Sequence, residues 1–427
     1  MGRVENGALI GNRGLGDAER EVVPGSREEG KTVKVVIIGG GIAGVSAAYA
    51  LMAADATLDV LLVEAEPSLS HHTTGRSAAQ LILNYGAAPL RALSKASLDF
   101  LHHPPEGLVD HPLLDRRAVL SVGTADQADS IDRLLAEGRA IDPSVEEITV
   151  EQAQRLFPPL RAELMDRAVL EVDSYDIDVA GLHQAFVRGA RAAGARLQTT
   201  AAAVGLDRVS GRWMVSLADD GPTTIVDHFD HVDRSAGIVV EADVVVNAAG
   251  AWGDVVAARA GVAPVGLQPM RRTAFMTPSR HPGSASWPLL VDADHNWYVK
   301  PDGSQFLCSP ADEQPSEPCD AKPEEIDVAR AIDRINTATT MDIRHVSSSW
   351  AGLRTFTSDR SMVVGPDRTE PSFIWCVGQG GTGIQTAPAT GRLVADLVLT
   401  GRPGESFGPY DLDLDNLLPD RFRTDQA

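Results

Sequence analysis

The sequence predicts a mixed fold, α/β plus α+β, in which a Rossmann-like domain is interleaved with a domain built on an antiparallel sheet. Three features of the 427 residues support this expectation. A short apolar run leads into closely spaced glycines and then into a helical pattern. The alternation of buried strand and helix recurs later in the chain. Between these units lie segments that alternate and turn as antiparallel strands do.

Regular structure is expected to begin at Val33. Residues 33–38 (VKVVII) form a short, β-branched, apolar run, which is typical of a buried parallel strand. Residues 42–52 have helical spacing, and residues 58–64 (LDVLLVE) form a second buried strand, so the three segments predict one βαβ unit. The preceding residues, 1–32, are rich in Gly, Glu and Arg and predict a disordered N-terminal tail.

The turn after the first strand carries the pattern G-x-G-x-x-G at Gly39, Gly41 and Gly44. The first glycine permits a tight turn, the second lets the backbone approach a pyrophosphate, and the third lets helix and strand pack closely. Free N–H groups at the helix start favour that anion. Glu64 follows 20 residues after Gly44, where a carboxylate accepts hydrogen bonds from an adenosine ribose. Together these features predict dinucleotide binding.

Later segments repeat the alternation of helix and strand. Residues 178–193 predict an amphipathic helix, residues 242–247 and 373–377 predict buried strands, and residues 386–399 predict a helix. The glycine cluster GQGGTGIQ at 378–385 places a helix N-terminus where it can stabilise negative charge on a reduced flavin. A two-domain NAD enzyme does not need this cluster, so the sequence favours FAD over NAD.

Antiparallel strands are expected at residues 116–121, 212–217, 272–277 and 296–301. Residues 219–237 predict a polar surface loop or a long hairpin. The histidines within that loop, His228 and His231, lie beside several aspartates, but loose clusters of this kind are usually solvated. No metal site is expected.

Composition is that of an ordinary globular protein, with 43% hydrophobic and 23% charged residues. The formal net charge of −21 argues against nucleic acid and anionic membranes as partners. The three cysteines, Cys308, Cys319 and Cys376, form no Cys-x-x-Cys pair and favour a reducing compartment. No apolar run is long enough for a transmembrane helix and no signal peptide is visible, so a cytoplasmic location is expected.

Several ordered motifs resemble the D-amino acid oxidase/dehydrogenase (DAO) superfamily of flavoenzymes, and within it bacterial D-arginine dehydrogenase. The resemblance runs from Val33 to about Leu399 and implies a DAO/glutathione-reductase-like fold with non-covalently bound FAD. Beyond the two glycine clusters, the motifs are HTTGRSAA at 72–79, HPLL at 111–114, NAAGAW at 247–252, LQP at 267–269, YVKPD at 298–302 and WAGLR at 350–354.

The resemblance also implies which residues contact the cofactor. The implied cofactor residues are Gly39, Gly41, Ile42, Ala43, Gly44, Glu64, Thr73, Thr74, Ser77, Ala78, Ala79, Ala203, Ala248, Gly250, Gly380, Gly383, Ile384 and Gln385.

A substrate site is implied as well, with two arginines that bind a carboxylate, two tyrosines that assist them and a carbonyl that accepts a hydrogen bond from the amine. The implied residues are Arg272, Arg354, Tyr85, Tyr298 and Gly381. The chemistry agrees, because arginine meets a planar carboxylate with a fixed fork of donors. Arg271 competes with its neighbour for the same role.

Two departures from the resembled family concern the substrate side chain. Val119 stands where arginine-specific relatives have a glutamate, and the matching pocket positions Ile82, Leu289 and Val291 are apolar. A buried guanidinium without a partner is costly, so apolar D-amino acids or cyclic imino acids are expected rather than D-arginine or D-lysine. Gln80 stands where the family has a histidine, which leaves proton transfer and lid contacts open.

These residues together predict oxidative deamination of a D-amino acid. The arginines would hold Cα near flavin N5, hydride would pass to N5, and the imino acid would hydrolyse to a 2-keto acid and ammonia. The alternatives are a secondary-amine or N-methyl amino acid oxidase of the sarcosine or glycine oxidase kind, a 2-hydroxy acid dehydrogenase and a non-catalytic flavoprotein. The expected partners are an amino acid and an electron acceptor, either oxygen or a quinone or other carrier.

The expected division of the chain is discontinuous. The FAD-binding domain takes residues 33–112, 172–208, 239–262 and 350–405, and the substrate-binding domain takes residues 113–171, 209–238 and 263–349. Residues 406–427 are expected to form a C-terminal tail.

Overall fold

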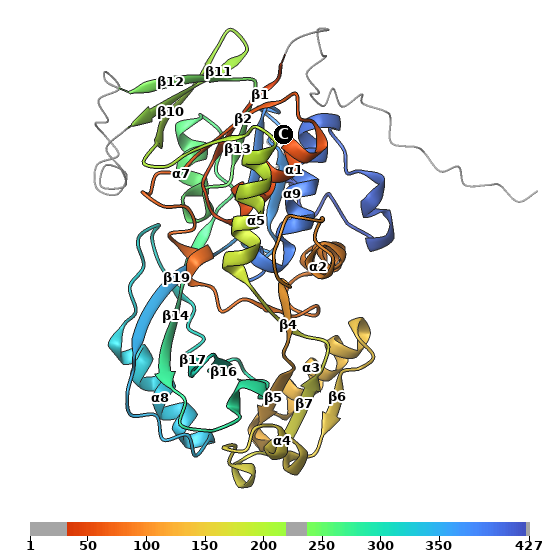
Figure 1. Cartoon of the computed structure of the whole chain (residues 1–427), viewed down its shortest axis with the longest axis vertical. Helices are drawn as coiled ribbons and strands as arrows, with labels where there is room; N and C mark the ends of the chain where they lie inside the picture. Colours follow the sequence, from red (N-terminus) through yellow and green to blue (C-terminus); the bar gives the residue numbers. More distant parts are fainter. Residues whose placement is uncertain (1–31, 219–236, 424–427) are drawn as a thin grey trace, which may run out of the picture.

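The computed structural model describes residues 32–218 and 237–423. Figure 1 shows a helix-rich part around one sheet at the top of the view and a second sheet with its own helices below. Most of the expected N-terminal tail, and the 219–237 loop except Gly237, lie outside the described residues, so His228 and His231 are not placed.

The upper sheet has six strands, and all neighbours are parallel except β20 and β21. In spatial order the strands are β20 (Val363–Pro366), β21 (Phe373–Val377), β13 (Val244–Asn247), β1 (Lys34–Ile38), β2 (Asp59–Val63) and β9 (Arg196–Gln198). The central strands are apolar on both sides, as a parallel sheet covered on both faces requires. The Rossmann-like expectation is confirmed.

Two different layers cover this sheet. The helices on one face are α1 (Ile42–Ala54), α5 (Val179–Ala192) and α9 (Gly383–Thr400), with α2 (Ala88–His102) packed on α9. The other face is covered by a small antiparallel sheet, β10 (Ala202–Val209), β11 (Arg212–Ala218) and β12 (Ile238–Ala242), and by α7 (Gly253–Arg259). Val35 and Ile37 of β1 face the helices, while Val36 and Ile38 face the other layer.

The lower sheet has nine strands and is mostly antiparallel. Along the sheet these are β18 (Gln314–Pro315), β14 (Gln268–Pro278), β17 (Gln305–Ser309), β16 (Tyr298–Asp302), β15 (Leu289–Asp292), β5 (Val119–Gly123), β7 (Arg167–Glu171) and β6 (Glu146–Ile148), with β19 (Ser348–Phe356) also paired to β14. Its helices are α3 (Ala128–Ile141), α4 (Val150–Leu156) and α8 (Glu325–Ala338).

Side chains of β5 point alternately to the two faces of the lower sheet, one of which is packed in a core while the other lines a cavity. Leu120 and Val122 point into a core that α4 and α8 help to form. Val119 and Ser121 point the other way and line a cavity. A short three-stranded sheet, β3 (Gln80–Leu81), β8 (Tyr175–Ile177) and β4 (Leu114–Arg116), connects the two parts of the molecule.

Most expected elements are found within a few residues of their expected bounds, and three differ. The single strand expected at 116–121 is two strands, β4 and β5, which belong to different sheets. β11 forms a hairpin with β10 and covers the upper sheet, although 209–238 was assigned to the substrate domain. β19 pairs along its length with β14 in the lower sheet, although residues 350–405 were assigned to the FAD-binding domain. The overall division into two domains stays a prediction.

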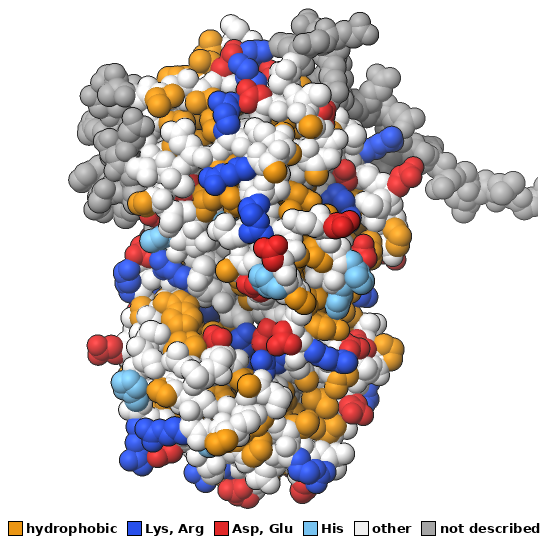
Figure 2. All heavy atoms as spheres, in the orientation of Figure 1, with side chains coloured by type: hydrophobic (Ala, Val, Ile, Leu, Met, Phe, Trp, Pro, Cys, Tyr) orange, Lys and Arg blue, Asp and Glu red, His pale blue; other side chains and the backbone are white. Residues whose placement is uncertain are grey.

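The C-terminal segment packs on the upper part rather than extending as a tail. Phe407 and Leu417 are buried, and the backbone N–H of Val364 donates to the Leu417 carbonyl at 2.9 Å. Figure 2 shows acidic and basic side chains interspersed over one face, with no large basic patch there among the described residues. None of the helices described is both long enough and apolar enough to cross a bilayer.

Candidate active site

The first glycine loop sits at the carboxyl end of β1 and leads directly into α1. Gly39 has a φ of +113°, and a Cβ there would lie 2.4 Å from the carbonyl oxygen of Ala248. A Cβ at Gly44 would lie 1.9 Å from the carbonyl oxygen of Gly39, so helix and strand are in backbone contact. Gly41 precedes α1 and supplies no side-chain cap. The helix start is therefore open to an anionic ligand.

Glu64 is held rigidly beside this loop. Its Oε2 accepts from the backbone N–H of Gly40 at 2.6 Å, and its Oε1 accepts from that of Glu66 at 2.8 Å. Burial raises the pKa of Glu64, and these backbone donors oppose the increase. The carboxylate lines a cavity of about 390 Å³ together with Ala203, among others. The carboxylate thus lines a cavity at the end of β2, where the sequence predicts that it meets an adenosine ribose.

A second cavity, of about 130 Å³, continues toward the second glycine cluster. The residues that line both cavities are Gly41, Thr73, Thr74, Ala248, Gly250 and Ala251. The hydroxyl of Thr73 donates to the carbonyl oxygen of Leu353 at 2.7 Å, and the N–H of Ile42 donates to Thr74 Oγ1 at 3.0 Å. A continuous channel thus runs from Glu64 to Gly380, as an extended dinucleotide requires.

Gly380 and Gly381 of the second glycine cluster leave no room for side chains. Gly380 has a φ of +55°, and a Cβ there would lie 2.3 Å from the ring of Phe356. A Cβ at Gly381 would lie 2.9 Å from the hydroxyl of Tyr85 and 3.1 Å from Nη1 of Arg354. The cluster therefore brings backbone against both the cofactor channel and the substrate side.

The expected carboxylate clamp is assembled by strand pairing. Arg272 on β14 lies opposite Gly352, so that Arg354, two residues further along β19, projects from the same face of the sheet. Nη1 of Arg354 donates to the hydroxyl of Tyr85 at 3.2 Å. Both arginines and Tyr298 line the second cavity and also a third cavity, of about 650 Å³. The third cavity thus opens directly onto the cofactor channel.

Arg272 has one anionic partner but keeps one buried donor without a partner. Its Nη2 donates to Oε1 of Glu313 at 3.0 Å, while its Nε is buried without a hydrogen-bond partner. Burial, and then repulsion from Arg354, lowers the pKa of the Arg272 guanidinium. The competing Arg271 projects from the opposite face, where it pairs with Glu324 and with Asp327. The geometry favours Arg272 for the clamp.

The third cavity has the apolar wall expected from the sequence. Val119, Leu289 and Val291 are buried there, with Ile82 and Tyr298 packed against them. The wall lies on the face of the lower sheet that points toward the clamp. An aliphatic group next to Cα would find apolar contacts in it.

Polar residues that the sequence analysis did not single out line the same cavity. Glu171 pairs across the strands with Val119, and its carboxylate accepts from Nδ2 of Asn84 at 3.0 Å. Glu313 bridges Arg272 and Arg360 at the clamp. The argument against cationic substrates considered Val119 alone, and strand pairing is not visible in one sequence. Consequently, the absence of a carboxylate at Val119 does not make the cavity free of carboxylates.

Two expected glutamine contacts lie on the substrate side. The amide of Gln80 donates to the carbonyl oxygen of Arg117 at 2.9 Å, and its own Oε1 is buried without a partner. Gln385, expected near the cofactor, lines the third cavity and not the second. Its amide bonds the backbone of Ile82 and the hydroxyl of Ser94. It fixes the segment that carries Tyr85.

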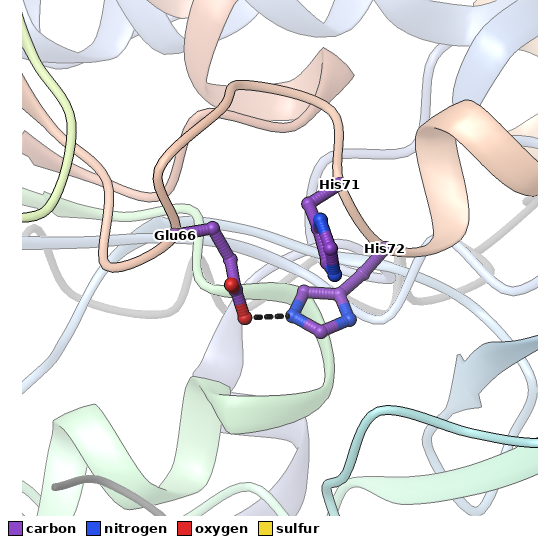
Figure 3. Close-up of side chains that lie close together, drawn as sticks. All are labelled: Glu66, His71 and His72. Carbon is purple, nitrogen blue, oxygen red and sulfur yellow. Dashed lines mark hydrogen bonds and ion pairs between the residues drawn. The ribbon is translucent and has the colours of Figure 1, made fainter. Parts of the chain in front are cut away.

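A cluster of possible metal ligands borders the adenosine end of the channel. Figure 3 shows Glu66, His71 and His72, whose ligand atoms lie within 4.8 Å of one another. Nε2 of His72 contacts Oε1 of Glu66 at 2.7 Å, and its ring lies 4.7 Å from that of Trp252. All three line the first cavity, so a metal ion would compete with the dinucleotide for the same space.

The family is identified by comparison with known proteins. Residues 34–397 match the family model DAO, described as FAD dependent oxidoreductase. The chain is 28% identical over 408 residues to FAD-dependent oxidoreductase domain-containing protein 1 of Bos taurus, covering 86% of this chain and 81% of that protein.

Solved structures share the fold. The crystal structure of glycine oxidase from Geobacillus kaustophilus has a TM-score of 0.74 and 21% identity, covering 90% of this chain and 99% of the other. L-proline dehydrogenase from P. horikoshii has a TM-score of 0.74 and 19% identity, covering 92% and 98%. The comparisons thus support the DAO family, and the relatives they name are FAD-dependent oxidoreductase domain-containing protein 1 and glycine oxidase rather than D-arginine dehydrogenase.

Proposed function

The chain belongs to the DAO family of FAD-dependent oxidoreductases, and on that premise we propose that it oxidises the C–N bond of an α-amino acid in the D configuration. The side chain next to Cα is apolar or part of a ring. The D configuration is supported by the motifs shared with D-amino acid dehydrogenases, and the apolar character by Ile82, Val119, Leu289 and Val291.

One observation carries the proposal. Arg272 and Arg354 project from one face of the lower sheet into a cavity that meets the cofactor channel, and Arg272 Nε is buried without a partner. A carboxylate placed there would satisfy that donor and relieve the repulsion between the two cations. A substrate of this family with a carboxylate therefore has a place to bind next to the redox group.

FAD supplies the acceptor for the hydride when it is bound in the channel. The residues of the chain do the rest by orientation: the arginines hold the carboxylate, and Tyr85 positions Arg354 through its hydroxyl. A Cβ at Gly381 would lie against both side chains, and the role proposed for its backbone carbonyl is to accept a hydrogen bond from the substrate amine. No side chain is required as a base if the amine reaches the site neutral.

A second candidate is an oxidase or dehydrogenase of secondary amines. Proline, named in the structural relative L-proline dehydrogenase, is an amino acid whose amine is secondary. The same clamp would hold such a substrate, and the cavity of about 650 Å³ has room for a substituent on nitrogen.

Anaerobic reduction of the bound flavin tests both candidates. The purified protein would be mixed with D- and L-amino acids, sarcosine, glycine, proline and 2-hydroxy acids while the absorbance of oxidised flavin is followed. We expect the fastest bleaching with a D-amino acid that has an aliphatic group next to Cα. Bleaching only by N-substituted amino acids would select the second candidate.

Two other results would remove the proposal. Bleaching only by 2-hydroxy acids would mean that the enzyme oxidises a C–O bond. Absence of bleaching by every compound would leave a flavoprotein without this activity. Adding oxygen or a quinone to the reduced protein would then identify the electron acceptor.

A further inference from the structure

The apolar wall of the substrate cavity ends in a carboxyl group. Leu289 pairs with Val119, and Val119 pairs with Glu171, so the three residues form one row across β15, β5 and β7. All three line the cavity. Because neighbouring strands lie about 4.8 Å apart, Glu171 is about 10 Å from Leu289 along this row. This distance suits the length of an extended aliphatic chain.

Glu171 is buried but keeps hydrogen-bonding capacity. One oxygen accepts from Asn84 at 3.0 Å and the other from the hydroxyl of Ser174 at 3.2 Å. A carboxylate can accept about four hydrogen bonds, so both oxygens remain able to accept another. Burial raises the pKa of Glu171 to about 7. Among the described residues, no cation forms an ion pair with this carboxylate.

The arginine and lysine side chains that line the cavity lie either at the clamp or in an ion pair. Arg272, Arg354 and Arg360 stand at the clamp, with Glu313 between Arg272 and Arg360. The other cation of the lining, Lys300, is paired with Asp176 at 2.7 Å. No arginine or lysine side chain among the described lining residues is therefore left to neutralise Glu171.

The end of α3 adds negative potential near Glu171. Gly138 of α3 packs beside Nδ2 of Asn84, and Asp142, just after the helix, interacts with Glu171 electrostatically. The C-terminus of a helix carries partial negative charge, which favours a cation nearby. Glu137 of the same helix also lines the cavity.

We propose that Glu171 is a specificity-determining residue that binds a cationic nitrogen at the end of an aliphatic substrate side chain. The inference rests on the proposed amino acid oxidation and narrows its substrate class. The stem of such a side chain would lie on Leu289 and Val119, and its ammonium or guanidinium group would meet Glu171. The group that recognises the cation would thus lie one strand away from Val119.

The other titratable groups near Glu171 lie on or just after α3 and on the turn between β15 and β16. Asp142 after α3 and Glu137 on α3 are carboxylates, and Asn84 and Ser174 do not titrate. On the turn between β15 and β16, Asp294 has a lowered pKa through hydrogen bonds from Ser130 and Gln127. His295 beside it has a pKa lowered by desolvation and then by repulsion from Arg272. Glu171 is thus the group expected to titrate near neutral pH.

The test compares cationic and neutral substrates of the same shape. D-Ornithine is paired with D-norleucine, and D-lysine with D-2-aminoheptanoate, in which a methyl group replaces the ammonium group. The kcat/KM ratio of cationic to neutral substrate is measured for the wild type, Glu171→Gln and Glu146→Gln, the last being an exposed acid on β6 that does not line the cavity. Flavin absorbance and melting temperature show whether each variant is folded.

We expect the wild-type ratio to rise about tenfold between about pH 6 and pH 8.5, because Glu171 ionises while the substrate ammonium stays charged. Glu171→Gln should lower the ratio at the higher pH by at least about tenfold, mainly through KM, and abolish its pH dependence. Glu146→Gln should change it by no more than about twofold, since exposed charges outside the cavity contribute little.

A wild-type preference for the neutral substrates at high pH, or an unchanged ratio in Glu171→Gln, would overturn the role of Glu171. In both cases, bleaching by the neutral amino acids would leave the proposed function standing. If neither member of any pair reduces the flavin, the proposed function itself fails and the inference fails with it.

Discussion

The cofactor channel and the substrate cavity share Gly381 in their lining, but they differ in whether backbone or side chains form them. The channel is formed by backbone at strand ends and helix starts, with Gly39 and Gly44 so close to other main-chain atoms that no side chain fits. The cavity is formed by side chains that project from separate strands of the lower sheet, such as Val119 and Arg272.

The difference shows where each region tolerates change. In the channel, affinity comes from N–H groups and tight packing, so most substitutions at the glycines would displace backbone. In the cavity, the backbone of the sheet stays fixed while a single side chain sets the charge or shape of one position. Substitutions should therefore separate cofactor binding from substrate selection.

The largest expected effect concerns the clamp. Arg272→Met should lower kcat/KM by about 100- to 4,000-fold, because removing one partner of a buried charged contact costs about 3–5 kcal/mol. The bound flavin should keep its absorbance, since the variant leaves the glycine loops intact. Steady-state kinetics and flavin content would be measured together.

Arg271→Met is the matched control for this variant. Arg271 is the adjacent residue on β14, but it pairs with Glu324 and Asp327 on the opposite face. The control should lower the melting temperature and change kcat/KM by only a few-fold. Equal losses of kcat/KM in both variants would show that the effect comes from damage to the sheet.

The next effect belongs to the channel. Glu64→Ala should weaken FAD binding by about 10- to 100-fold, since each hydrogen bond to a charged group contributes about 1.5–3 kcal/mol. Titration of the apoprotein with FAD would give the dissociation constant. At saturating FAD, KM for the substrate should be that of the wild type, and an altered KM would contradict the separation of the two regions.

A smaller effect is expected where the two regions meet. Tyr85→Phe removes the hydroxyl that accepts from Arg354 and should lower kcat/KM by about 2- to 10-fold. Stopped-flow reduction of the flavin at several substrate concentrations would separate binding from hydride transfer. An unchanged reduction rate and unchanged KM would exclude Tyr85 from the clamp.

The last effect concerns stability rather than activity. The carboxyl of Glu171 has a usual pKa of 4.5 when the chain is unfolded and a pKa of about 7 in the folded protein. Between these values the folded state holds a proton that the unfolded state has lost, so stability falls as pH rises and stays lower above pH 7. Because glutamine carries no charge, Glu171→Gln should raise the free energy of unfolding at alkaline pH by up to about 3 kcal/mol. Its melting temperature should exceed that of the wild type at alkaline pH and converge with it at acidic pH; parallel curves would contradict this linkage.

The channel could be predicted from the sequence because its determinants are contiguous. Gly39, Gly41 and Gly44 follow a recognisable strand and open a recognisable helix, and Glu64 ends the next strand. The spacing alone therefore places them. The structure has this arrangement, and the family match supports the cofactor.

The cavity could be predicted only in part. Arg272 and Arg354 came from motifs, but the choice of Arg272 over Arg271 needed the face of β14 from which each projects. Glu171 was missed because its place depends on pairing between β5 and β7, which are separated in the chain by α3, β6 and α4. Residues 209–238 were likewise assigned to the substrate-binding domain, whereas Trp213 of β11 is buried against the upper sheet, and that burial has no signal in local sequence.

In the row formed by Leu289, Val119 and Glu171, the strand that carries the charged residue sets the length of the substrate side chain that can reach it. Moving a charged residue from one strand to its neighbour shifts the recognition point by about 4.8 Å, which is the length of a few methylene groups. Each position can mutate independently because the three strands are distant in the chain. Divergence among such enzymes, or their redesign, can therefore proceed in strand-sized steps without disturbing the redox centre.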